Sequence, residues 1–144
     1  KEGKKVAIIS FGARLDECVK ASKTLFSKGI DCTIVDARFV KPLDEKLIME
    51  IASNHEVVLT IEEGSIGGFS SHVMQFLSSL GVFDSGLKFR SMILPDTFID
   101  QDTPENMYKS AGLDYLSIVS KVENALNSNV IFAPNKKKIN PIQN

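Results

Sequence analysis

The feature that most constrains the fold of this chain is a regular alternation between short apolar runs and segments with helical periodicity. Four runs are predicted to be strands: residues 5–10 (KVAIIS), 32–37 (CTIVDA), 56–63 (EVVLTIEE) and 88–94 (KFRSMIL). These runs are largely apolar rather than strictly alternating, which is typical of strands buried on both faces of a sheet. The segments between them carry apolar residues every three or four positions, a pattern that predicts amphipathic helices.

Capping residues predict where several helices begin and end. Gly29 is expected to end the first helix, Asp44 to cap the second, and Thr103, followed by Pro104, to cap a short helix late in the chain. The predicted apolar faces carry Leu15, Val19, Ser22 and Phe26; Leu47, Ile48, Ile51 and Ala52; Val73, Phe76, Leu77 and Leu80; and Leu116, Val119, Val122 and Leu126.

This alternation predicts an α/β fold of three layers, α/β/α, with a mostly parallel sheet joined by right-handed crossovers. We expect the strand order 2-1-3-4. Residues 1–128 are predicted to form one domain, followed by an irregular tail over residues 129–144. Because the sequence begins with Lys1 just before a strong strand, we expect it to be a piece of a longer protein.

Composition excludes several classes of partner. The formal net charge of the 144 residues is −1, with basic and acidic residues intermixed, so we expect neither nucleic acid nor a membrane surface as partner. No apolar run approaches the ~18 residues of a membrane helix, and a cytoplasmic location is predicted. Cys18 and Cys32 are expected to be reduced core residues. His55 and His72 have no ligand-spaced partner, so a metal site is not predicted.

A dinucleotide site is the first alternative that the sequence raises. Gly12 follows the first strand and Asp36 ends the second, near the positions that a nicotinamide-binding fold uses. The glycine fingerprint is incomplete, however, and Asp16 and Glu17 in the first helical turn would repel a pyrophosphate. A free-standing flavodoxin-like domain that binds a flavin or another small ligand at the switch point, beside Gly12 and residues 62–68, is an alternative.

A glycine-rich loop after the third strand is the stronger candidate site. It lies at the carboxyl end of a parallel strand, where open α/β sheets usually place function. It carries two carboxylates and no basic residue, which disfavours phosphate binding. We therefore predict an inter-domain or dimer interface, with the Phe69 side chain inserted into a neighbour. The predicted interface residues are Glu62, Glu63, Gly64, Gly67, Gly68, Phe69 and His72. No residue is predicted to be catalytic, and a second acidic stretch, at 96–105, is interpreted as a solvated linker.

Four stretches taken together, SFGARLDECVKA, DARFVKPLD, EEGSIGGFSSHV and LPDTFIDQDTPENMYKSAGLD, resemble the C-terminal domain of 1-deoxy-D-xylulose-5-phosphate synthases. The resemblance covers about residues 4–127. The glycine-loop motif is shared more loosely with other transketolase-like enzymes, including the β subunits of 2-oxoacid dehydrogenases. One departure is Ser70, where many relatives have glycine.

The resemblance implies a parent enzyme that uses thiamine diphosphate and Mg²⁺ to join a two-carbon unit from pyruvate to glyceraldehyde 3-phosphate. In such enzymes the cofactor and catalytic residues belong to the two preceding domains, so no cofactor is expected in this chain. The implied role is structural: packing against the preceding domains and supporting a homodimer. The resemblance also implies a fifth, antiparallel edge strand, which we place upstream of Lys1.

Overall fold

The computed structural model describes residue 3 and residues 5–128 of the chain. The predicted irregular tail, residues 129–144, lies outside the described residues. The elements, in chain order, are β1 (Val6–Phe11), α1 (Leu15–Ser27), β2 (Cys32–Asp36), α2 (Glu45–Asn54), β3 (Val57–Glu62), α3 (Phe69–Ser79), the short 3₁₀ helix η1 (Val82–Ser85), β4 (Lys88–Met92), α4 (Pro104–Ser110) and α5 (Tyr115–Asn127).

The sheet confirms the predicted order. Its four strands within the described residues run β2-β1-β3-β4 and pair in parallel throughout. Val6 of β1 lies opposite both Cys32 of β2 and Val57 of β3, so the strands begin level and their carboxyl ends share one edge. The chain steps outward from β1 to β2 and then returns to β3 on the other side, which creates a switch point between β1 and β3.

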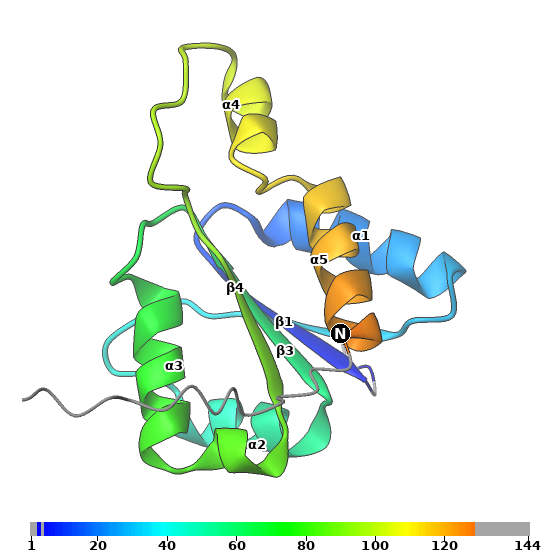
Figure 1. The fold of residues 1–144 in the computed structure, drawn as a ribbon, viewed down its shortest axis with the longest axis vertical. Helices are drawn as coiled ribbons and strands as arrows, with labels where there is room; N and C mark the ends of the chain where they lie inside the picture. The colour runs from blue at the N-terminus through cyan, green and yellow to red at the C-terminus, as the bar shows by residue number, and fades with distance from the viewer. Residues whose placement is uncertain (1–2, 4, 129–144) are drawn as a thin grey trace, which may run out of the picture.

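Helices cover both faces of the sheet, as the three-layer prediction requires. Figure 1 shows α1 and α5 on one face and α2 and α3 on the other, with α4 projecting beyond the carboxyl edge. Successive residues of β1 point to opposite faces: Ile8 packs with α1 and α5, and Ile9 packs with α2 and α3. The apolar, non-alternating strands are therefore buried by two separate cores.

The predicted capping residues are confirmed. Gly29 adopts φ +78°, which suits glycine, and its N–H donates to the Phe26 carbonyl at 3.0 Å. The Asp44 carboxylate accepts from the Leu47 N–H at 3.0 Å, and the Thr103 hydroxyl accepts from the Asn106 N–H at 3.4 Å. These contacts provide hydrogen-bond partners for backbone N–H and C=O groups at the helix ends that lack a partner within the helix.

The predicted apolar faces are wrong in part. Val19, Phe26, Leu80 and Leu116 are exposed. In α1 the buried stripe is Cys18, Ala21, Ser22 and Leu25, which is shifted from the predicted one. Small residues lie on this stripe because α1 packs closely against both the sheet and α5. The prediction assigned the larger apolar residues Val19 and Phe26 to the buried face of α1, but they lie beside it.

Both cysteines are buried and neither forms a disulfide with the other, as predicted. Burial raises the pKa of the Cys18 thiol from 9.0 to about 12, outweighing the Ser10 hydroxyl, which lowers it. Because the thiolate is the reactive form, Cys18 in the native chain is expected to resist alkylation by iodoacetamide near pH 8. Peptide mass spectrometry after a timed pulse measures this directly. Rapid native labelling that matches the rate in denaturant would contradict the buried assignment.

Candidate functional site at the carboxyl edge

Glu62 organises the edge of the sheet at the switch point. It is the last residue of β3 and only 3% exposed. Its carboxylate accepts from the backbone N–H groups of Phe69, at 2.9 Å, and Ser70, at 2.7 Å, which open helix α3. A helix N-terminus is where a phosphate or another anion would bind, and here the chain's own carboxylate occupies that position.

The glycines of the loop make room for this carboxylate. A Cβ atom placed on Gly64 would lie 2.8 Å from Glu62 Oε2, and one on Gly68 would lie 2.9 Å from Glu62 Cδ. Both distances are shorter than side chains tolerate, so the backbone approaches Glu62 only because these residues lack side chains. Gly67 has a different requirement: its φ of +101° strains any other residue.

Phe69 packs inside its own domain, which corrects the prediction that it inserts into a neighbour. It is 2% exposed, and its ring stacks on that of Phe11 with centroids 5.1 Å apart and an interplanar angle of 13°. Phe11 is the last residue of β1, so the stack lies at the switch point. The crevice in which open α/β sheets usually bind ligands is filled by two aromatic rings of the chain itself.

Ser70 shows why serine is compatible with a position where many relatives have glycine. It lies in the first turn of α3, and all positive φ values in the described chain belong to glycines. Its buried hydroxyl accepts from the Thr60 hydroxyl at 2.9 Å. The departure from the family pattern therefore leaves the loop backbone intact.

Arg14, Glu63 and Tyr108 form a second polar group at the same edge. Arg14 Nε lies 3.0 Å from Glu63 Oε1, as an ion pair rather than an aligned hydrogen bond. The Arg14 guanidinium lies 3.6 Å from the centroid of the Tyr108 ring, a cation–π contact. A hydrogen bond to Glu63 raises the pKa of the Tyr108 hydroxyl above its ordinary value.

This group anchors α4 to the body of the domain. Its members come from the turn before α1, the glycine loop and α4, which are far apart in sequence. No motif relates them, so the sequence analysis missed Arg14 and Tyr108. One sequence feature could have indicated a basic partner: the glycine loop carries carboxylates and no basic residue. A half-buried carboxylate such as Glu63 requires a basic partner from elsewhere in the chain.

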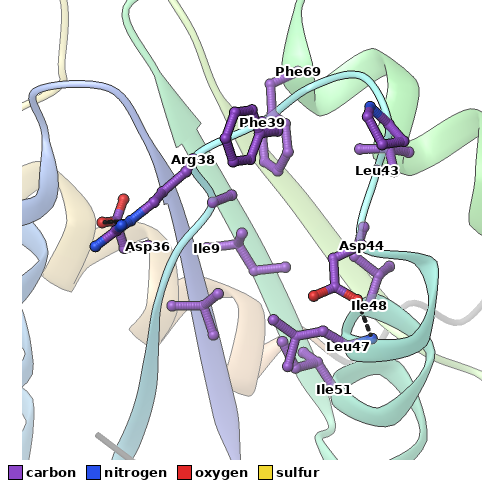
Figure 2. A pocket seen from close by; sticks show the side chains of 13 residues that line it. Ile9, Asp36, Arg38, Phe39, Leu43, Asp44, Leu47, Ile48, Ile51 and Phe69 are labelled. Carbon is purple, nitrogen blue, oxygen red and sulfur yellow. Dashed lines mark hydrogen bonds and ion pairs between the residues drawn. The ribbon is translucent and has the colours of Figure 1, made fainter.

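An apolar cavity of about 230 Å³ lies between the carboxyl end of β2 and helix α2. Figure 2 shows Ile9, Leu47, Ile48 and Ile51 lining it, with Arg38 and Asp36 at one side. Arg38 Nε is 3.5 Å from Asp36 Oδ2, and both side chains are largely exposed. The cavity offers apolar surface and no buried polar group aimed into it, so it is suited to an apolar side chain.

The remaining predicted residues lie apart from one another. His72 is half-buried in the first turn of α3, and the stretch 96–105 is mostly exposed, as expected of a solvated linker. His55 makes contacts of 2.8 Å with the Thr33 hydroxyl and with the Ile51 carbonyl. Within the described residues no group of three His, Cys, Asp or Glu side chains could hold a metal ion. In the same part of the chain, no helix is long and apolar enough to cross a membrane.

These observations define a three-layer α/β domain whose usual ligand site is closed by its own side chains. The chain belongs to the transketolase C-terminal domain family: residues 1–118 match the family described as "Transketolase, C-terminal domain".

The fold is also similar to a solved structure described as "Split gene transketolase, inactive beta4 tetramer". The TM-score is 0.78 and the sequence identity is 32%. The likeness covers 88% of this chain but only 40% of that one, so the present chain spans less than half the length of that relative.

Proposed function

We propose that this chain is the C-terminal domain of a 1-deoxy-D-xylulose-5-phosphate synthase, a cytoplasmic transferase, and that its role there is to support the dimer and not to catalyse. The proposal rests on family membership together with the four motif stretches from SFGARLDECVKA to LPDTFIDQDTPENMYKSAGLD. We take the four stretches together, and not any one of them, as favouring the synthase over other transketolase-like enzymes.

The closed switch point is the observation that carries the non-catalytic part of the proposal. The Phe11–Phe69 stack and the Glu62 carboxylate occupy the positions that a ligand would need. A diphosphate group would meet a carboxylate at the start of α3, and the described residues provide no carboxylate cluster for Mg²⁺. These features support our proposal that thiamine diphosphate and Mg²⁺ bind in the other domains of the parent.

Reconstitution in two pieces tests the proposal. The parent enzyme, truncated before this domain, is expected to regain pyruvate- and glyceraldehyde-3-phosphate-dependent product formation when this chain is added. Because Glu63 and His72 are predicted interface residues, variants of this chain at these positions that preserve the fold are expected to raise the concentration of chain needed for reconstitution and to leave the turnover at saturation unchanged within about twofold. A truncated enzyme that is fully active and dimeric without this chain would refute the structural role.

A transketolase parent is the second candidate. It is favoured by the 32% identity to a protein described as a split-gene transketolase. The requirement for pyruvate separates the two, because the synthase takes its two-carbon unit from pyruvate. Activity of the reconstituted enzyme without pyruvate would favour the transketolase.

A further inference from the structure

The segment between β4 and α5 contains no buried residue. Met92 at the end of β4 is 4% exposed and Leu113 before α5 is 1% exposed, but every residue from 93 to 112 is half-buried or exposed. We call this segment the arm. It contains an irregular stretch and helix α4, and Figure 1 shows it projecting beyond the carboxyl edge of the sheet. A segment with few buried apolar contacts can open locally while the rest of a domain stays folded.

Two cavities lie beside α4, so its packing against the domain is loose. One, of about 520 Å³, lies between α4, α1 and α5. The other, of about 270 Å³, is lined by residues of the arm itself: Leu94, Ile99, Pro104, Met107 and Tyr108. α4 also has only seven residues, and an isolated helix of that length is not stable in water. Release of the arm is therefore expected to unfold α4 as well.

Tyr108 of α4 is held by two side chains from the body of the domain. The Arg14 guanidinium lies 3.6 Å from the centroid of the Tyr108 ring, and the Arg14 side chain is only 14% exposed. A cation–π contact contributes more when it is shielded from water in this way. The Tyr108 hydroxyl also donates a hydrogen bond to Glu63. Contacts with charged side chains, rather than a buried apolar face, therefore fasten the arm to the domain.

Glu63 connects these contacts to the glycine loop. Its Oε1 atom lies 3.0 Å from Arg14 Nε, but the pair is not aligned as a hydrogen bond. The Glu63 side chain is 28% exposed, so a cationic group of a neighbouring domain or molecule can reach it. Such a group would compete with Arg14 and Tyr108 for the same carboxylate. A neighbour that binds the loop at Glu63 is therefore expected to loosen the arm.

We infer that residues 93–112 form an arm that opens from the folded domain, with Arg14 as the latch that holds it closed and Glu63 as the link between the latch and the glycine loop. The closed state is the one that the structure shows, with Tyr108 seated on Arg14. In the open state α4 is unfolded and the sheet with its other helices is intact. The inference concerns this chain alone and stands whichever enzyme is the parent.

Native-state hydrogen exchange, followed by NMR on the 144-residue chain, tests whether the arm opens separately. The backbone amides of Met107 and Ala111 in α4 are expected to exchange at least about tenfold faster than those of Ile8 and Leu59 in the inner strands. Low concentrations of urea should accelerate exchange in the strands and leave α4 unchanged, because a local opening exposes little surface. Equal rates with equal urea dependence would overturn the inference, since the arm would then open only with the whole domain.

Substitutions in the same experiment test the latch. Arg14→Met and Tyr108→Leu are each expected to accelerate exchange in α4 at least about fivefold, because each removes the cation–π contact. The double variant should exchange no faster than the faster single one, since both substitutions remove the same contact. Glu63→Ala is expected to accelerate α4 at least about threefold, because Arg14 loses its ion pair and the Tyr108 hydroxyl its acceptor.

Ile48→Val is the control, because it weakens the core beside α2 and leaves the contacts of the arm in place. Ile48 is 5% exposed, so the loss of one methyl group is expected to accelerate exchange in the inner strands about fivefold and leave α4 unchanged. If Ile48→Val accelerated α4 as much as the strands, the arm would not open by itself. If Arg14→Met left α4 unchanged, Arg14 would not be the latch, and the same result for Glu63→Ala would remove the link to the loop.

Discussion

Phe69→Ala is expected to lower the free energy of unfolding by about 3–5 kcal/mol, the usual range for truncating a buried phenylalanine. The side chain is 2% exposed and packs with Ile9, Val73 and Leu77 in the core between the sheet and α2–α3. Its removal also ends the stack on Phe11, whose ring centroid lies 5.1 Å away. Urea denaturation monitored by circular dichroism measures the change.

Phe26→Ala is the matched control for this prediction. It removes the same side chain from a helix, but Phe26 is 64% exposed, so the free energy of unfolding is expected to change by less than about 1 kcal/mol. The original interface interpretation of Phe69 makes the opposite forecast. If Phe69→Ala left the stability of the isolated chain unchanged, its side chain would be free for a partner and the buried assignment would be wrong.

The framework of the fold could be predicted because it depends on local patterns that repeat. Apolar runs separated by helical segments determine a parallel sheet, and crossover handedness then leaves few strand orders. Caps such as Asp44 and Gly29 are recognisable because each acts within a few residues of itself. These features do not depend on knowing which segments meet in space.

The candidate site was less predictable because its contacts join distant segments. Glu62 was predicted to lie in an interface, but within the chain it is buried, where two N–H groups from the start of α3 satisfy its carboxylate. Arg14 contacts Glu63 and Tyr108, both of which lie far from it in the sequence. The buried faces of the helices were predicted only in part for a related reason. A sequence pattern shows which residues are apolar, but the close packing of α1 against α5 determines that Ala21 is buried and Phe26 is exposed.

Gly68→Ala is expected to lower the free energy of unfolding by about 2–3 kcal/mol, as overpacking of a tight core does. The backbone φ of Gly68, −81°, suits alanine, so the cost comes from space alone. The added methyl would overlap Glu62 Oε2 and would also lie 2.9 Å from Glu62 Cδ and 3.0 Å from Oε1. A carboxylate on a flexible stem could move aside, but this one holds two buried hydrogen bonds that would be lost as it moved.

A double-mutant cycle with Glu62→Ala isolates this mechanism. Glu62→Ala alone is expected to cost about 2–4 kcal/mol, since it strips the partner from two N–H groups at the start of α3. Once the carboxylate is gone, Gly68→Ala meets no obstruction and its cost should nearly vanish, which corresponds to an interaction energy of about 2–3 kcal/mol. Gly67→Ala is the control: it has φ +101° and nothing within 4 Å, so its strain should add to that of Glu62→Ala. The free energies of unfolding are measured by urea denaturation. If the cost of Gly68→Ala simply adds to that of Glu62→Ala, as is expected for Gly67→Ala, then Glu62 is not the reason that position 68 requires glycine.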